Sequence, residues 1–133
     1  MAVKSPSARF FPARFDEGRT RFRDAAQAAG ARISSHANPR RGSEGEPLST
    51  EAAWLGPRDA GRLLVCMAGT HGAEGFCGSG IETGWLESGL LTQLPPNTAV
   101  LLIHAINPHG FSWVRRVNED NIDLNRNCID HAK

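Results

Sequence analysis

One histidine and one glutamate stand three positions apart in the glycine-rich stretch AGTHGAEGFCGSG, residues 68 to 80. Imidazole nitrogen and carboxylate oxygen are both zinc ligands, and a catalytic site of the His₂Glu type keeps a further position open for water. His71 and Glu74 could supply two of those ligands, and Gly72 and Gly75 would let both side chains face one point. Alone, the pair is weak evidence, because this spacing arises by chance in many chains. Taken alone, a flexible glycine turn is the better explanation.

A second segment, NPHGFSWVRRVNEDNIDLNRN at residues 107 to 127, changes the balance between these interpretations. It carries Arg115, Arg116, Asn125 and Arg126. Arginine binds carboxylates through two parallel hydrogen bonds and can stabilise an oxyanion, and asparagine adds directional hydrogen bonds. The segment therefore predicts an anion-binding wall that faces a metal.

Two apolar runs precede these polar segments and predict the elements that position them. LLVCMA (63 to 68) is typical of a strand covered on both faces, and TAVLLIHAI (98 to 106) has the same character. A loosely helical segment from about Glu74 to Leu90 lies between them, which predicts a βαβ unit and an α/β fold. Ligands of such sheets collect beyond the carboxyl ends of the strands, where both polar segments begin.

The preceding residues predict a helix followed by a hairpin. The helix spans 16 to 29, with Asp16 as N-cap and Gly30 as stop. Strands at 31 to 37 and 48 to 54 follow and are expected to pair. Residues 1 to 9 are expected to be loose, so that residues 10 to 133 form one globular unit.

Composition and charge exclude several classes of partner. Fifteen Lys and Arg nearly balance fourteen Asp and Glu, so no overall field favours nucleic acid or an anionic membrane. The three cysteines show no CxxC spacing, which excludes a disulfide framework and a four-cysteine zinc site. With no signal-peptide or membrane-spanning run, we expect a cytoplasmic protein. Nucleotide binding by the glycines is disfavoured, because GxxxxGK[ST] is absent.

GTHGAEGFCGSG, NPHGF and RVNEDNIDLNRN, in this order, resemble the M14-type zinc carboxypeptidase superfamily, which includes the succinylglutamate desuccinylase and aspartoacylase branch. The likeness is closest to the branch known as DUF2817. It implies the N-terminal part of a zinc-carboxypeptidase-like, mixed and largely parallel sheet flanked by helices. It also implies one zinc ion, with His71 and Glu74 as its first two ligands.

The same resemblance assigns the polar residues of the second segment. Arg116 matches the arginine that polarises the scissile carbonyl, and Arg115 is the neighbouring alternative. Asn125 and Arg126 match the pair that grips the substrate carboxylate. The expected reaction is hydrolysis of an amide bond next to a carboxylate, in a peptide or an N-acyl amino acid.

The likeness covers only the N-terminal half of the family's domain, from about Phe10 onward. The third zinc ligand, a later histidine, and the general base, a later glutamate, have no counterpart, since His131 follows Arg126 too early. We therefore expect a catalytically incomplete chain that self-associates through uncovered sheet surface beside residues 98 to 106. The alternative is a truncated fragment or binding module without hydrolase activity of its own.

Two further residues are predicted to have supporting roles rather than to bind metal. His104 lies inside an apolar strand, where a hydrogen-bonded core histidine is more frequent than a metal ligand. Asp123 could hold Arg126 or cap the turn.

Overall fold

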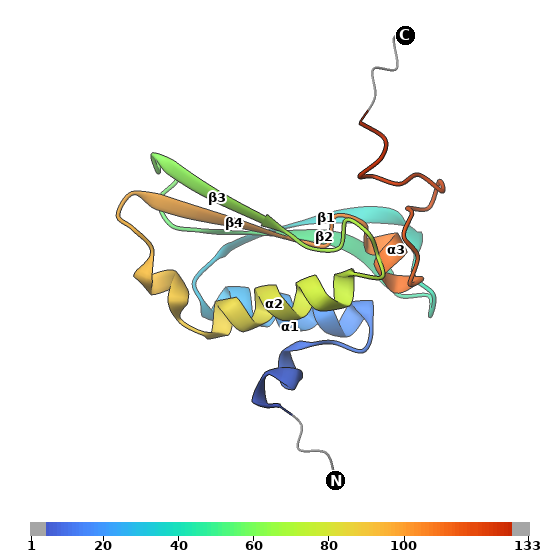
Figure 1. Ribbon diagram of the computed structural model, residues 1–133, viewed down its shortest axis with the longest axis horizontal. Coiled ribbons are helices and arrows are strands. Elements are labelled where there is room, and N and C mark those ends of the chain that lie inside the picture. The colour runs from blue at the N-terminus through green and yellow to red at the C-terminus, as the bar shows by residue number, and fades with distance from the viewer. Residues whose placement is uncertain (1–4, 129–133) are drawn as a thin grey trace.

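A four-stranded mixed sheet with helices on one of its faces forms the body of the protein (Figure 1). The computed structural model describes residues 5–128. Its elements, in chain order, are η1 (Pro6–Phe10), α1 (Phe15–Ala28), β1 (Arg32–Arg41), β2 (Pro47–Leu55), β3 (Arg62–Met67), α2 (Gly75–Glu87), η2 (Leu90–Gln93), β4 (Thr98–His104) and α3 (Pro108–Ser112).

The sheet has the strand order β1-β2-β4-β3. β1 and β2 form the expected antiparallel hairpin, and β2 also pairs antiparallel with β4. β3 and β4 are parallel, with Val65 opposite Leu101, and α2 connects them. The predicted α/β class, with a mixed sheet and a βαβ unit, is therefore confirmed.

The first helix begins slightly earlier than expected. Arg14 rather than Asp16 is the N-cap, and it makes no capping hydrogen bond through its side chain. Asp16 lies instead in the first turn, where its negative charge interacts favourably with the positive end of the helix dipole. The chain leaves the helix at Gly30 with φ 76°, as predicted.

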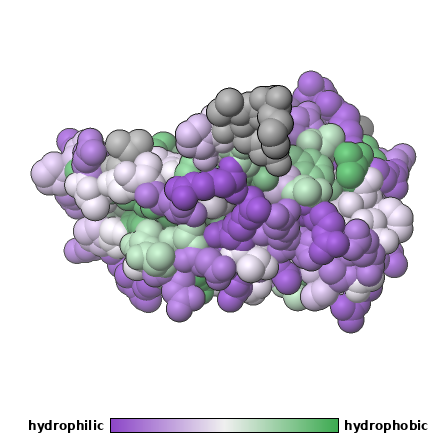
Figure 2. All heavy atoms as spheres, turned by 90° about the horizontal axis from the view of Figure 1, so that it is seen from below, coloured by the Kyte–Doolittle hydropathy of each residue, from purple (hydrophilic) through white to green (hydrophobic). Residues whose placement is uncertain are grey.

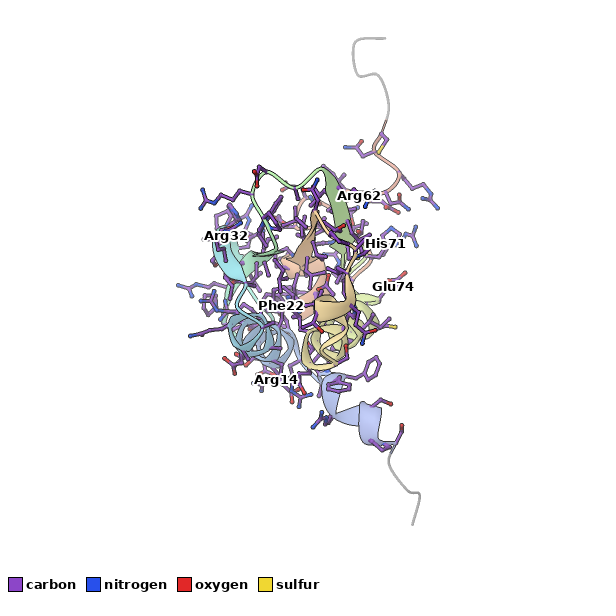
Figure 3. The ribbon with its side chains drawn as sticks, turned by 90° about the vertical axis from the view of Figure 1, so that its left-hand side faces the viewer. Arg14, Phe22, Arg32, Arg62, His71 and Glu74 are labelled. Carbon is purple, nitrogen blue, oxygen red and sulfur yellow. The ribbon has the colours of Figure 1, made fainter. Side chains whose placement is uncertain are left out.

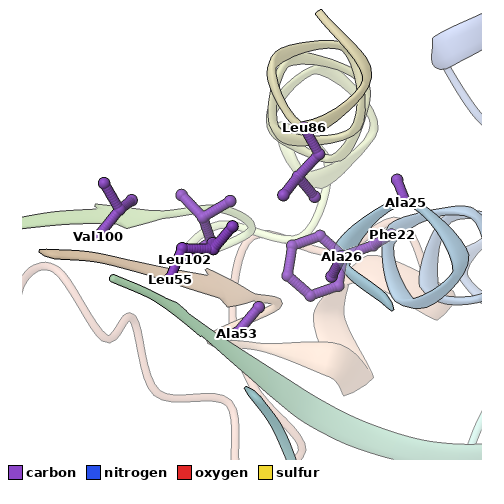
Figure 4. Packing of buried hydrophobic residues seen from close by; sticks show 8 residues of the cluster. All are labelled: Phe22, Ala25, Ala26, Ala53, Leu55, Leu86, Val100 and Leu102. Carbon is purple, nitrogen blue, oxygen red and sulfur yellow. The ribbon is translucent and has the colours of Figure 1, made fainter. Parts of the chain in front are cut away.

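The main core lies between the sheet and the two long helices. α1 and α2 run along the same face of the sheet in Figure 1, and Figure 4 shows their side chains meeting those of β2 and β4. Burial of each large apolar side chain stabilises by roughly 1.5–3 kcal/mol. The cluster comprises Phe22, Ala25, Ala26, Ala53, Leu55, Leu86, Val100 and Leu102.

The glycines of α2 permit close packing against neighbouring segments. A Cβ at Gly78 would press on Ala68, directly after β3. The low helix propensity of this segment is thus offset by a close approach that a larger residue would prevent.

His104 is a core residue, as the sequence predicts. Its ring is fully buried, lies 5.0 Å from the ring of Phe22, and has Nε2 2.9 Å from Ser79 Oγ. Burial lowers the pKa of His104 to about 4, so the ring is neutral at pH 7.

Polar contacts tie α1 to the hairpin. Glu51 on β2 is 1% exposed and pairs with Arg23 of α1 at 2.6 Å. Its carboxylate also accepts hydrogen bonds from Ser35 (2.9 Å) and Ser49 (2.6 Å). These partners satisfy a charge that would otherwise be costly to bury.

The expectation that residues 63–68 form a strand covered on both faces is wrong for β3. β3 lies at the edge of the described sheet, with Leu63 50% and Met67 61% exposed. β4, beside which uncovered surface was expected, lies between β2 and β3. Within residues 5–128, the edge strand beside β4 is therefore β3.

The surface on the helical side is mainly hydrophilic, with small apolar areas (Figure 2). No helix within residues 5–128 has the length and apolar character needed to cross a membrane.

Glu82 of α2 is an acidic side chain inside this fold. It is 5% exposed, and neither carboxyl oxygen meets a hydrogen-bond donor of normal geometry among residues 5–128. Burial raises the pKa of Glu82 to about 9, against an ordinary value of 4.5. The side chain is therefore protonated at neutral pH.

We expect Glu82→Gln to remove a pH dependence of stability. Because the folded-state pKa is raised, the stabilisation by the protonated carboxyl is complete below pH 4.5 and is lost as the pH rises to about 9. The free energy of unfolding of the unmodified chain should fall by roughly 2–4 kcal/mol between pH 5 and 8. Urea unfolding at both pH values measures this fall, which the variant should lack.

The matched control is Glu87→Gln, on the exposed side of the same helix. It should keep the pH dependence of the unmodified chain. An equal fall in Glu82→Gln would show that Glu82 ionises normally in the folded protein.

Candidate metal and anion site

The polar segments meet at one end of the sheet because β3 and β4 run in parallel. The ladder between them continues beyond the strands, since the N–H of Ile106 donates to the carbonyl of Ala68 and that of Asn107 donates to Gly69, both at 2.9 Å. Both strands therefore deliver their following loops to the same edge, the usual ligand position in α/β sheets. α3 lies at this end of the molecule in Figure 1.

Gly72 joins the two loops through its backbone. Its N–H donates to the carbonyl of Arg115 at 3.0 Å, and a Cβ at this position would overlap the carbonyl group of Gly110. Gly110 is equally confined, by the side chain of Asn107 and the carbonyl of Arg115. The glycines thus serve close backbone packing, which fixes the loop that carries His71 and Glu74.

His71 and Glu74 converge, as their spacing predicts (Figure 3). Nδ1 of His71 lies 3.4 Å from Oε1 of Glu74. Two ligand atoms at about 2.0–2.2 Å from one tetrahedral zinc are themselves about 3.4 Å apart, so this separation fits two ligands of one ion. Among residues 5–128, no group of three or more His, Cys, Asp or Glu side chains could hold a metal. The described residues therefore provide a two-ligand corner.

Asp123 links this corner to an arginine. Its Oδ1 lies 2.9 Å from Nε2 of His71, and its Oδ2 accepts a hydrogen bond from Nε of Arg116 at 2.7 Å. The hydrogen bond from Arg116, followed by that from His71, holds the pKa of Asp123 well below its usual range. The side chain is therefore ionised at neutral pH.

This contact differs from the role that the sequence indicated for Asp123. Its carboxylate contacts His71 and Arg116 rather than the side chain of Arg126. It also caps the local turn by accepting from the N–H of Asn125 at 3.0 Å, as predicted. The contact with His71 spans 52 positions, and no local spacing reveals such a contact.

The two neighbouring arginines point to different partners. Arg116 is half-exposed, and its terminal nitrogens make no hydrogen bond within the described part of the chain. Arg115 donates instead to Oδ1 of Asn121 at 2.9 Å. The structure thus brings Arg116, but not the guanidinium of Arg115, to the carboxylate that holds His71.

Asn125 and Arg126 lie on the turn that Asp123 begins. The N–H of Arg126 donates to the carbonyl of Asp123, and its Nη1 donates to the carbonyl of Asn125 at 3.0 Å. Both residues are exposed. They are close to the corner through their backbone, with no side-chain contact to His71 or Glu74.

Fold and site together define an α/β protein with a His–Glu pair and a carboxylate-held arginine beyond two parallel strands. The chain belongs to the DUF2817 family, described as a protein of unknown function, which matches residues 11–133. Among curated proteins, none matches this chain.

Solved structures of similar fold include three glutaminyl cyclases. That from Tannerella forsythia has a TM-score of 0.53 and 13% identity, and the match covers 89% of this chain and 50% of that one. The enzymes from Fimbriiglobus ruber (TM-score 0.48, 13% identity, 73% and 40% covered) and Porphyromonas gingivalis (0.42, 16%, 76% and 48%) are also similar. This chain spans half or less of their length. At 13% identity, the match to the Tannerella forsythia protein shows the fold alone.

We expect Gly72→Ala to disturb both the fold and the corner. The added methyl group must displace the carbonyl of Gly110, and overpacking of this kind costs about 1–3 kcal/mol. Urea unfolding measures the loss, and the NMR signals of the His71 ring report the change in its environment. Ala73→Ser, at the exposed neighbouring position, is the control and should leave both unchanged. A Gly72→Ala chain as stable as the original would contradict the close contact.

Proposed function

We propose that this chain provides the metal-binding and substrate-anchoring half of a zinc-dependent amide hydrolase of the M14 carboxypeptidase type. The observation that supports this proposal is the 3.4 Å separation of His71 Nδ1 and Glu74 Oε1, with Asp123 on the opposite ring nitrogen. A carboxylate on the far nitrogen of a histidine is the usual arrangement behind a metal ligand. An incidental pair on a flexible turn would not require it.

Asp123 selects the form of His71 that binds metal. Its ionised carboxylate favours the tautomer in which Nε2–H of His71 donates to Asp123, and this leaves the lone pair of Nδ1 free on the side of Glu74. His71 and Glu74 would then hold zinc, which when bound polarises a carbonyl group and lowers the pKa of water to about 7. A third ligand and a general base would come from outside the described residues. His131 lies outside them as well.

Arg116 is positioned to stabilise negative charge near this corner. Its Nε is held by Asp123, so that the free terminal nitrogens can donate to an oxyanion. Asn125 and Arg126, on the adjoining turn, would bind the carboxylate of a peptide or an N-acyl amino acid. Arg115 is the alternative candidate for stabilising the oxyanion and ranks second, because its guanidinium already donates to Asn121.

The proposed reaction is hydrolysis of an amide bond next to that carboxylate. This chain alone is not expected to catalyse it. The alternative is a binding module that never forms part of a hydrolase, and it rests on the same two-ligand corner. The Tannerella forsythia neighbour is a glutaminyl cyclase by name. At 13% identity, the match does not indicate which reaction this chain would serve.

Zinc binding is the first test of the proposal. We expect one Zn²⁺ per chain, bound weakly because two protein ligands hold it. His71→Ala should lower the affinity at least about tenfold, and Asp123→Asn by roughly 10–100-fold, because it removes the partner of the ligating ring. Isothermal titration calorimetry at pH 7.5 measures both changes.

The control for zinc binding is His36→Ala, an exposed histidine on β1. It should leave the affinity unchanged. Equal zinc affinities of the original and the His71→Ala chain would reject the metal site.

Carboxylate binding is a separate test. In the presence of zinc, N-acetylalanine should perturb the NMR signals of the corner, and Arg126→Gln should weaken its binding by roughly tenfold, the worth of a hydrogen bond between charged groups. Arg115→Gln is the matched comparison and should change the affinity less. A larger loss of affinity in Arg115→Gln than in Arg126→Gln would contradict the assignment of the carboxylate to Arg126. No hydrolysis is expected from any of these chains.

A further inference from the structure

The backbone on both sides of Arg116 is held by other parts of the chain. The carbonyl of Arg115, in the peptide group that precedes Arg116, accepts a hydrogen bond from the N–H of Gly72 at 3.0 Å. The carbonyl of Arg116, in the peptide group that follows, accepts one from Nδ2 of Asn107 at 3.5 Å. Because each peptide group is planar, holding both of them limits the direction in which the side chain of Arg116 leaves the backbone.

Asn107 is suited to this task because it is itself fixed on several sides. It is 1% exposed and is the N-cap of α3, where its Oδ1 accepts from the N–H of Gly110 at 2.7 Å. Its own N–H donates to the carbonyl of Gly69 at 2.9 Å. The bond to the carbonyl of Arg116 is long, but it is the hydrogen bond that Nδ2 makes within residues 5–128. A buried amide is costly to leave without a partner, so this contact satisfies the second half of the side chain.

The turn that leads into Arg116 contains a strained residue. α3 ends in a Schellman-type turn, in which the N–H of Arg115 donates back to the carbonyl of Gly110 at 2.7 Å. Val114 has φ 52°, in the left-handed region that glycine usually occupies at this position. A β-branched residue is unfavourable there, and such a conformation persists only where the surrounding structure holds it. The hydrogen bonds on either side of Arg116 provide that support.

We propose that Asn107 is a positioning residue for Arg116, a role that rests on the function proposed above for that arginine. The side chain of Arg116 is half-exposed, and its Nε donates to Asp123 at 2.7 Å. A long arginine side chain at the surface has many rotamers to lose when it forms such a bond. By holding the carbonyl of Arg116, Asn107 keeps the guanidinium within reach of Asp123 and so beside the His71–Glu74 corner. Asn107 acts on the chemistry of the corner through Arg116.

The exchange of the Nε proton of Arg116 with water, followed by NMR in the metal-free chain, tests the proposal. Asn107→Ser keeps an oxygen that can cap α3 but removes the donor to Arg116, whereas Asn107→Ala removes both. We expect roughly threefold faster exchange or more in both variants, because the bond from Arg116 to Asp123 is then formed for less of the time. Exchange at the original rate in Asn107→Ser would overturn the proposal, since Asn107 would then serve only as the cap of α3.

Asn97→Ser is the matched control for a general loss of stability. Asn97 directly precedes β4, at the opposite end of the strand from the corner, and its Oδ1 accepts from the N–H of Gly61 at 2.9 Å. Its φ of 59° suits asparagine better than serine, so the variant should unfold at a lower urea concentration. The exchange of the Arg116 Nε proton should stay at the original rate. An acceleration equal to that in Asn107→Ser would contradict the proposal.

The side-chain amide of Asn107 in the unmodified chain gives a second measurement, which does not require a variant to fold. Its buried protons should exchange with water at least about tenfold more slowly than those of the exposed Asn127. Equal rates would overturn the proposal, because an amide that is open to water does not hold Arg116. Both measurements are made without metal. A chain that fails to bind zinc therefore rejects the function proposed for the corner, while the exchange rates decide the role of Asn107 separately.

Discussion

The close contact between Gly72 and Gly110 is the constraint on which the functional end of the molecule depends. The N–H of Gly72 donates to the carbonyl of Arg115, and no Cβ fits between the two loops. This single approach sets the position of His71 and Glu74 relative to the segment that carries Arg116. If the loops separated by even a methyl group, the hydrogen bond between His71 and Asp123 would lengthen. The charge interactions of the site therefore depend on this backbone packing.

Charged groups are treated in opposite ways in the core and at the corner. Burial raises the pKa of Glu82 and lowers that of His104, so both are neutral in the folded protein. At the corner, hydrogen bonds from Arg116 and His71 keep Asp123 ionised. An ionised carboxylate thus lies where a metal and an anion could use it, while Glu82 and His104 in the core carry no charge. One physical rule, the cost of an unpaired buried charge, accounts for both patterns.

The free edge of β3 and the corner are neighbouring features of one parallel strand. The same strand that delivers His71 to the end of the sheet leaves its apolar side chains open along the edge. A strand that paired with β3 would therefore also border the site.

The sequence by itself determined the elements whose signals are local. Apolar runs at 63–68 and 98–106 predicted β3 and β4, and the spacing of His71 and Glu74 predicted their convergence, because both patterns act over a few residues. The tertiary structure alone decided that Asp123, rather than serving Arg126, bridges His71 and Arg116. It also decided that β3 lies at an edge, although its composition resembles that of a covered strand. Contacts across 52 positions and the order of strands depend on how distant segments pack, and that packing leaves no periodic trace in the chain.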